Sequence, residues 1–205
     1  KPSKVREVVH HPAMPYIEIP AYFQSLIKKD SIASLALSFQ IVAATRSGET
    51  RGATWKEIDL KNNVWTIPPE RMKTRRRFRV PLTAEAKSIL KTAKRFEQNG
   101  FVFPGLSGDK PISDTAVRKI LKETHPKLTT HGFRSTFRDW CAEQTNFPRE
   151  VAESALAHAL ENKTEAAYQR GDLLLKRRKL MESWSTHLTA KQTKKVVQIR
   201  KKKNG

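Results

Sequence analysis

The chain has 205 residues, of which 38% are hydrophobic, and 40 Lys and Arg against 20 Asp and Glu give it a formal charge of +20. This length is enough for one domain with a buried core. The charge favours a polyanionic partner, and nucleic acid is the stronger expectation than an anionic membrane surface. The single cysteine, Cys141, excludes an internal disulfide and is typical of a reducing compartment. The most apolar stretch, 32–44, is shorter than the about 20 residues of a membrane span.

Helical patterns begin after residues 1–15, whose three prolines indicate a linker. Pro20, in a first-turn position, opens a predicted helix over 19–29. Ser31 is suited to cap an apolar helix over 32–44, and a short helical turn is expected from Ser47 to Ala53.

The periodicity changes between Trp55 and Leu82, where "WKEIDL", "VWTI" and "RFRVPL" are short, partly β-branched runs. They predict a small three-stranded antiparallel sheet, with a turn at Asn62-Asn63 and with Lys73 to Arg76 at or near the second turn. Helices are expected again at 83–98, 113–123, 131–145, 148–157, 163–170 and 173–188. The predicted fold is therefore mainly α with a small three-stranded antiparallel sheet (α+β), over residues 16–188, followed by a basic, disordered tail over 189–205.

The stretch "HGFRSTFRDW" separates two kinds of side chain on one helix. At 100° per residue, one arc carries His131, Arg134 and Arg138, and another carries Phe133, Phe137 and Trp140. Three groups that can share one sign of charge suggest an anion between them. An ordinary amphipathic helix with a solvated basic face is the alternative.

In "ATRSGET", Arg46 directly follows the apolar helix, so it is expected to be partly buried, with Glu49 placed to orient it. A guanidinium is suited to grip two phosphate oxygens. The alternative is a cation at a helix C-terminus with an ion-pair partner.

The run "RMKTRRRFRV" is a basic segment on the predicted hairpin. Lys73 is its candidate general acid, because lysine, unlike arginine, can give up a proton. The other cations are expected to be solvated, and charge and position make Arg75, Arg76, Arg77 and, further along, Arg118 candidate DNA contacts.

Tyr168 is the one tyrosine after residue 22, and it has polar, charged neighbours. A tyrosine nucleophile needs nearby positive charge or a base, which His158 and Arg170 offer, although a structural tyrosine covering the core is the alternative. The candidate groups together suit a phosphate diester. No metal-ligand spacing and no glycine-rich phosphate loop occur in the sequence, and Cys141 is expected to serve packing.

The order Arg46, Lys73, His131-x-x-Arg134, His158 and Tyr168 resembles the catalytic domain of tyrosine recombinases, the phage-integrase family. The segments "ATRSGETRGATWKEIDL", "ERMKTRRRFRVPL", "HGFRSTFRDW" and "LAHALENKTEAAYQRGDLLLKRRKLMESW" are similar to integrases of satellite prophages and pathogenicity islands. The resemblance covers about 12–188. It implies the tyrosine recombinase catalytic-domain fold for 16–188 and, before the linker 1–15, DNA-binding domains that this sequence lacks.

The resemblance also implies a role for each residue. Tyr168 would attack the scissile phosphodiester and leave a 3′-phosphotyrosyl link and a free 5′-hydroxyl. Arg46 and Arg134 would stabilise the transition state, and Lys73 would protonate the leaving oxygen. The supporting roles are proton transfer for His131, a hydrogen bond to phosphate for His158, and bracing of Arg46 for Glu49. No metal, ATP or other cofactor would be required.

The implied function is site-specific recombination, which integrates or excises a prophage or genomic island. The expected partners are double-stranded DNA attachment sites, a homo-tetramer on that DNA, and accessory DNA-bending or directionality proteins, with no membrane, in the bacterial cytoplasm. The segment 173–188 would dock on a neighbouring protomer or pack on its own core. The competing functions are DNA relaxation by a type IB topoisomerase-like enzyme and a non-catalytic DNA-binding module, and the complete six-residue set argues against the second.

Overall fold

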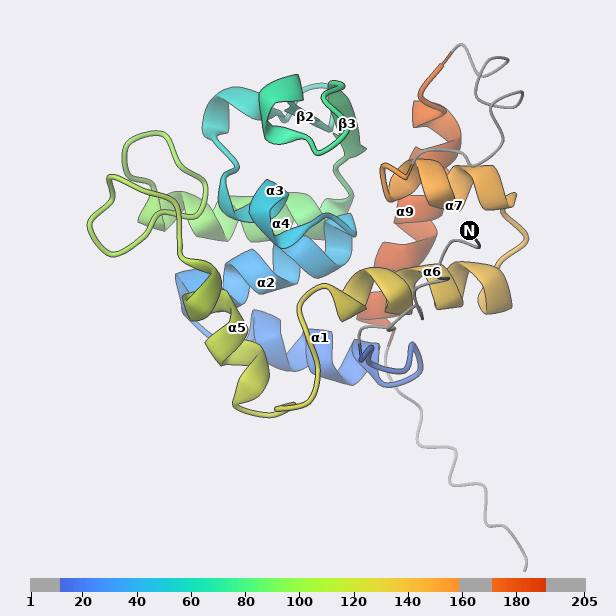
Figure 1. Cartoon of the computed structure of the whole chain (residues 1–205), viewed down its shortest axis with the longest axis horizontal. Helices are drawn as coiled ribbons and strands as arrows, with labels where there is room; N and C mark the ends of the chain where they lie inside the picture. Colours follow the sequence, from blue (N-terminus) through green and yellow to red (C-terminus); the bar gives the residue numbers. More distant parts are fainter. Residues whose placement is uncertain (1–11, 159–170, 191–205) are drawn as a thin grey trace, which may run out of the picture.

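The computed structural model describes residues 12–158 and 171–190, and these form a mainly helical protein with one small sheet (Figure 1). This confirms the predicted fold class, and the predicted helix 163–170 lies outside the described residues. None of the described helices has the length and apolarity needed to cross a membrane. The helices are α1 Ile19–Ile27, α2 Ile32–Ala43, α3 Ser47–Arg51, α4 Ala84–Ala93, α5 Asp114–Lys122, α6 Gly132–Gln144, α7 Arg149–Ala155 and α9 Leu174–Thr189. The strands are β1 Ile58–Asp59, β2 Val64–Ile67 and β3 Phe78–Pro81.

The three strands form an antiparallel sheet in the order β1-β2-β3, as predicted. The central strand pairs Trp65 with Ile58 on one side and with Val80 on the other. The first strand is shorter than the run "WKEIDL" suggested, because Trp55–Glu57 forms a 3-10 turn. The Glu57 carboxylate holds this turn in place by accepting a hydrogen bond of 2.9 Å from the Trp65 indole N–H.

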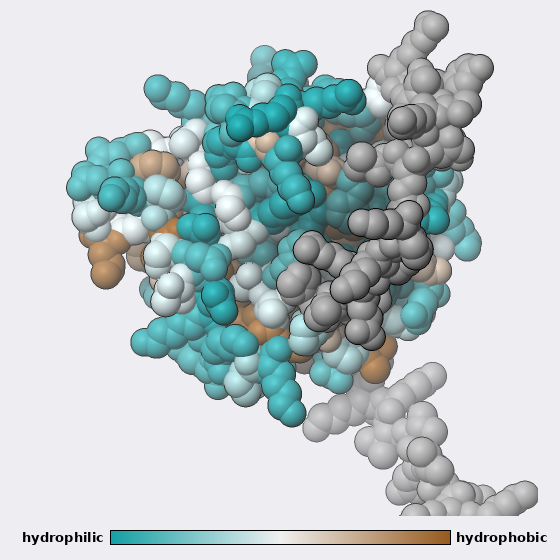
Figure 2. Space-filling view, viewed as in Figure 1, coloured by the Kyte–Doolittle hydropathy of each residue, from teal (hydrophilic) through white to brown (hydrophobic). Residues whose placement is uncertain are grey.

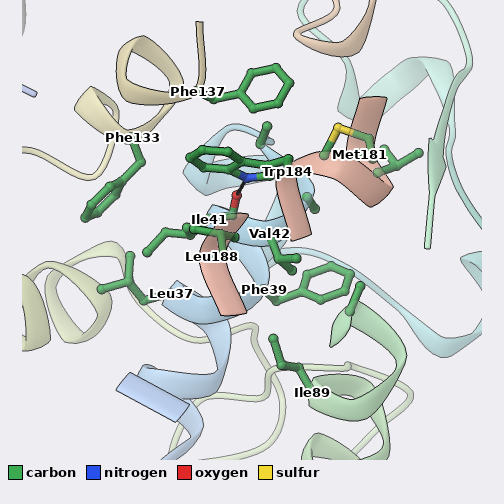
Figure 3. Close-up of a cluster of buried hydrophobic side chains, with 14 of the residues drawn as sticks. Leu37, Phe39, Ile41, Val42, Ile89, Phe133, Phe137, Met181, Trp184 and Leu188 are labelled. Carbon is green, nitrogen blue, oxygen red and sulfur yellow. Dashed lines mark hydrogen bonds between the residues drawn. The ribbon is translucent and has the colours of Figure 1, made fainter. Parts of the chain in front are cut away.

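The core is built around α2, most of which is buried. The Ser31 hydroxyl caps α2 by accepting the backbone N–H of Ser34 at 3.2 Å, as the sequence predicted. The C-terminal helix α9 packs on this same core through Met181, Trp184 and Leu188 (Figure 3). The Trp184 indole N–H donates to the Ile41 carbonyl at 3.0 Å. Of the two expectations for this helix, packing on its own chain is therefore the one observed.

The N-terminal segment is fastened to the beginning of α6. The Thr136 hydroxyl donates to the Met14 carbonyl at 2.6 Å, and Met14 itself is buried. A Cβ atom at Gly132 would lie 2.3 Å from the Pro12 carbonyl oxygen, so this position has no room for a side chain. The backbone of residues 12–14 thus lies directly on the helix that carries Arg134.

Hydrophilic side chains cover much of the face shown in Figure 2, including the region over β2 and β3. The connection between these strands carries Arg75, Arg76 and Arg77, all of them exposed. Arg75 has a positive φ of 53°. This is the predicted basic hairpin.

Candidate active site

The connection between α2 and α3 positions Arg46. Ala44 ends α2 in a left-handed conformation, with φ 52°, and Arg46 then becomes the N-cap of α3. The backbone N–H of Arg46 donates to one Glu49 carboxylate oxygen at 2.8 Å, and its guanidinium donates to the other at 2.8 Å. The Arg46 side chain is 23% exposed and that of Glu49 4%. The expectation of a partly buried arginine oriented by Glu49 is confirmed.

Arg134 is buried at the centre of the site, with 4% of its surface exposed. Its guanidinium donates to the carbonyl of Ala44 at 2.8 Å and to that of Leu156 at 2.6 Å. Its Nε is buried and has no hydrogen-bond partner among the described residues. Arg134 is therefore not part of a solvated basic face, which was the alternative interpretation of this helix.

Burial lowers the pKa of Arg134 to about 10, and the positive charge of Arg46 contributes in the same direction, while Glu49 and Glu153 oppose it. Arg134 is still cationic at neutral pH. Two guanidiniums that repel each other, one of them desolvated, form an electrostatic environment that favours a bound anion.

His158 lies against Arg134 in a fixed tautomer. The Arg134 Nη2 is 2.9 Å from His158 Nε2, and because a guanidinium has only donors, Nε2 accepts this hydrogen bond. The Nδ1–H of His158 donates to the Glu153 carboxylate at 2.6 Å. Burial lowers the pKa of His158, the hydrogen bond to Glu153 opposes this, and Arg134 and Arg46 lower the pKa further. The imidazole is neutral in this arrangement.

Glu153, on α7, is a member of the site that the sequence analysis missed. It is 9% exposed, and its second carboxylate oxygen accepts a hydrogen bond of 2.8 Å from Arg138 Nε. Burial alone would raise the pKa of Glu153, but the hydrogen bonds from His158 and Arg138 outweigh it and hold the pKa below its usual value. A carboxylate among the buried residues Val151, Ala152 and Ala155 was the signal available in the sequence.

Lys73 and His131 occupy exposed positions. Lys73 lies in the β2–β3 connection. Arg71 ties this connection to α3 by donating to the Glu49 carbonyl, and to the 3-10 turn before β1 by donating to the Glu57 carboxylate. His131 is the N-cap residue of α6, where the Thr129 hydroxyl accepts the Gly132 N–H at 3.1 Å. Arg46, Glu49, Arg134 and His158 are thus brought together, whereas the described contacts do not join Lys73 to them.

Tyr168 lies outside the described residues. At the beginning of the described range 171–190, a cluster of residues holds the beginning of α9 against β3. There Arg79 donates to both Asp172 carboxylate oxygens at 2.8 Å, and the buried Arg177 donates to the backbone carbonyls of Asp172 and Arg79. The segment that contains Tyr168 is preceded by His158 and followed by Asp172. Both of these flanking residues have defined contacts with the same domain.

The remaining candidates have simpler surroundings. Arg118 is exposed, and its guanidinium lies 3.9 Å from the Asp114 carboxylate. Burial raises the pKa of Cys141 to about 12, so this thiol is a packing group, as expected. Among the described residues, no group of three or more His, Cys, Asp or Glu side chains is arranged to hold a metal ion.

A model of the phage integrase family matches residues 18–173. The chain belongs to the phage integrase family. It is similar to the prophage integrases IntZ and IntA of Escherichia coli K12, with 33% identity over 188 residues and 32% over 194. It is also 26% identical over 208 residues to the integrase of Enterobacteria phage P4. These alignments cover 89%, 90% and 91% of this chain.

The chain spans about half the length of these relatives, namely 46% of IntZ, 46% of IntA and 47% of the P4 integrase.

Solved structures show the same fold, that of tyrosine recombinase catalytic domains. A lambda integrase dimer bound to a COC′ core site matches with a TM-score of 0.59 and 18% identity, over 76% of this chain and 60% of that one. The XerH site-specific recombinase bound to difH, in a pre-cleavage complex, matches with a TM-score of 0.57 and 17% identity, over 82% of this chain and 55% of that one.

Proposed function

We propose that this integrase-family chain catalyses site-specific DNA recombination, in which a prophage or genomic island is integrated or excised by cleavage and rejoining of DNA strands. The observation that carries the proposal is the buried Arg134 beside Arg46. A desolvated guanidinium whose Nε has no hydrogen-bond partner among residues 12–158 and 171–190, next to a second guanidinium, is suited to bind an anion. A phosphodiester is the anion that the basic chain would bring there. The family membership supports the same reaction.

In the proposed mechanism, Arg46 and Arg134 bind the non-bridging oxygens of the scissile phosphate. Negative charge grows on these oxygens in the pentacoordinate transition state, so cations fixed in advance stabilise it more than the ground state. Glu49 and the carbonyls of Ala44 and Leu156 hold the two guanidiniums in place before DNA binds. His158 then gives the phosphate a further hydrogen bond.

Tyr168 is the proposed nucleophile, and it forms a 3′-phosphotyrosyl link as the 5′-oxygen leaves. Lys73 donates the proton that the 5′-oxygen needs, and His131 assists the proton transfers. The energy of the cleaved bond is kept in the covalent link, so the reaction requires neither a metal ion nor ATP. A 5′-hydroxyl from another strand reverses the step and completes the exchange.

The proposed partner is double-stranded DNA, with Arg75, Arg76, Arg77 and Arg118 among its contacts. One of the solved structures is a lambda integrase tetramer bound to a Holliday junction, with a TM-score of 0.58 and 18% identity. By analogy, we propose a homo-tetramer on DNA, assisted by DNA-bending or directionality proteins. In this arrangement 16–188 is the catalytic domain, 1–15 links it to DNA-binding domains, and 189–205 is a basic tail.

A trapping experiment tests the proposed chemistry. The chain, and a version extended to the length of its relatives, are mixed in EDTA with an end-labelled, nicked duplex that contains the attachment site. The reaction is quenched in detergent. A covalent adduct that disappears in Tyr168→Phe is the expected result. Adduct on any supercoiled plasmid, with relaxation and without sequence preference, would indicate a topoisomerase-like enzyme instead. DNA binding without adduct from either version would leave a non-catalytic module.

A further inference from the structure

The two partners of His158 determine where the hydrogen atoms between Glu153, His158 and Arg134 lie, because a guanidinium only donates and a carboxylate only accepts. His158 donates through Nδ1 to Glu153 at 2.6 Å and accepts through Nε2 from Arg134 at 2.9 Å. Both ring nitrogens are therefore engaged. In this state Nε2 presents a lone pair and no hydrogen.

A phosphate cannot be recognised by this form of His158, because phosphate oxygens are acceptors and need a donor. Moving the proton from Nδ1 to Nε2 would leave the Nδ1 lone pair facing the Glu153 carboxylate at 2.6 Å, with no hydrogen between two acceptors. A donor at Nε2 therefore requires one more proton on the pair. The pair then exists as imidazolium with carboxylate, or as imidazole with carboxylic acid, and the proton count is the same.

We propose that binding of the scissile phosphodiester is coupled to uptake of one proton by the Glu153–His158 pair, and that Glu153 is the positioning residue for this step. The inference rests on the proposed function, because it takes the bound anion to be a DNA phosphodiester. The proton comes from solvent, an N–H or O–H bond forms within the pair, and no other bond changes. Arg134 then directs the N–H that it gave to His158 toward the phosphate.

The charges around His158 explain why an anion would drive this uptake. Arg134 and Arg46 both lower the pKa of His158 in the absence of a ligand, and the carboxylate of Glu153 opposes them. A phosphodiester between the arginines neutralises part of their field, so the imidazolium becomes less costly. The charged and titratable groups on the packed elements are Arg134 and Arg138 on α6, Arg149 and Glu153 on α7, and Arg46 with Glu49 at the beginning of α3.

The environment of Glu153 suits it for holding the extra proton. Arg138 donates to its other oxygen at 2.8 Å, and Arg149 lies 3.9 Å from that same oxygen. Against the effect of burial, the hydrogen bonds from His158 and Arg138 hold the pKa of Glu153 below its usual value, so the carboxylate is ready to stabilise an imidazolium as the anion arrives. A glutamine at 153 would still accept the Nδ1–H of neutral His158 but would lack the charge that supports the protonated form. This difference separates a proton-coupled role from a purely structural one.

The sign of the pH dependence follows from linkage. The pKa of His158 is lower without the anion than with it, so the complex takes up a proton and binding strengthens as the pH falls between the two pKa values. Below the pKa of the free form, which lies under the ordinary histidine value of about 6.5, both forms are protonated and the dependence disappears.

The test uses dimethyl phosphate as the probe, since its single negative charge does not change over about pH 5 to 8 and any pH dependence then belongs to the protein. Binding to the full chain is followed through the ring signals of His158 in a protein labelled with ¹⁵N-histidine. The dissociation constant is measured across this pH range for the original protein, for Glu153→Gln, and for Glu150→Gln. The last variant is the matched control, because it removes the same charge from the same helix.

In the original protein, the dissociation constant should fall by up to about tenfold for each unit by which the pH is lowered. This is the slope for uptake of one proton. Glu150→Gln should retain this slope. In Glu153→Gln, this pH dependence should disappear or move to lower pH. At pH values above the pKa of His158 in the complex, its affinity for the probe should differ little from that of the original protein.

Other outcomes overturn the inference in distinguishable ways. Binding of equal strength at every pH in the original protein would refute proton uptake and leave the proposed function standing, and this measurement needs no variant. A full slope in Glu153→Gln, or equal weakening at every pH, would refute the role of Glu153. His158 signals that do not respond to the probe would contradict both the inference and the anion site of the proposed function.

Discussion

Replacement of Glu49 by glutamine tests whether this buried carboxylate holds Arg46 in position. The two Glu49 carboxylate oxygens each accept a hydrogen bond of 2.8 Å, one from the Arg46 backbone N–H and one from its guanidinium. Glu49→Gln keeps one of these acceptors and places an NH₂ group against the other N–H donor. One hydrogen bond to a charged group contributes about 1.5–3 kcal/mol, and loss of one partner of a fully buried pair costs about 3–5 kcal/mol. Because the Arg46 side chain is 23% exposed, the pair is not fully buried, and the cost should lie in the range for one hydrogen bond to a charged group. We expect the free energy of unfolding to fall by about 2 kcal/mol, which corresponds to a fall in Tm of roughly 4–8 °C for a chain of this size.

Urea denaturation measures the free energy of unfolding, and the rate of adduct formation on the nicked duplex measures the catalytic effect. Glu123→Gln is the matched control, since it breaks an ion pair with Lys29 in which both side chains are more than a third exposed, and it should cost less than about 0.5 kcal/mol. Adduct formation should slow at least about tenfold in Glu49→Gln, because misplacing one transition-state donor costs up to about 100- to 1,000-fold.

A double-mutant cycle with Arg46→Met shows whether the stability loss comes from the pair. In the Arg46→Met background, Glu49→Gln should be neutral or stabilising, which gives a coupling energy of about 1–3 kcal/mol. A coupling energy near zero would refute the argument. So would equal stabilities for the Glu49 and Glu123 variants.

Three further predictions concern the packing around the site, each measured by urea denaturation. Gly132→Ala should lower the free energy of unfolding by about 1–3 kcal/mol, because its Cβ would collide with the backbone of 12–13. Gly48→Ala is the control: a Cβ there meets nothing within 4 Å, so the free energy of unfolding should stay the same or rise by up to about 1 kcal/mol. Equal effects of the two substitutions would contradict this. Trp184→Phe should lower the free energy of unfolding by about 1–3 kcal/mol, because it removes one of the two hydrogen bonds that the buried Ile41 carbonyl accepts and leaves a space unfilled. A loss under about 0.5 kcal/mol would contradict this. Asp172→Asn should lower the free energy of unfolding by less than about 1 kcal/mol at neutral pH. Since the pKa of Asp172 is lowered in the folded state, this loss should begin to shrink as the pH falls below about 4 and should vanish only below the folded-state pKa. A loss that did not shrink in acid would contradict the ion pair with Arg79.

Local features of the site were predictable from the sequence because the interacting groups are near neighbours in the chain. The Arg46–Glu49 pair is separated by three residues across one helical turn, and the Ser31 cap lies immediately before its helix. The strands were recognisable from their β-branched composition and the turn at Asn62-Asn63. In each case the physical cause acts over a few residues.

The remaining features depend on tertiary contacts, which periodicity does not encode. Arg134 was placed on the correct arc of its helix, but its burial depends on the carbonyls of Ala44 and Leu156 from two other segments. Glu153 was missed because its partner Arg138 lies on another helix, and its contact with His158 forms only where α7 ends. The pairing of Arg79 with Asp172 joins positions 93 residues apart.

The roles of Lys73, His131 and Tyr168 stay predictions, since each depends on a substrate or on residues outside the described ranges. In the proposed mechanism, strand cleavage depends on Tyr168. A lone tyrosine in polar surroundings was the sequence signal for it.

The most direct measurement of the central claim is the chemical site of the covalent link. The trapped adduct would be digested with nuclease and trypsin, and tandem mass spectrometry would locate the remaining nucleotide on the peptide. The account predicts a 3′-phosphonucleotide on the Tyr168 oxygen, and none on Tyr16 or Tyr22. A nucleotide attached to a serine, a histidine or another tyrosine would contradict it.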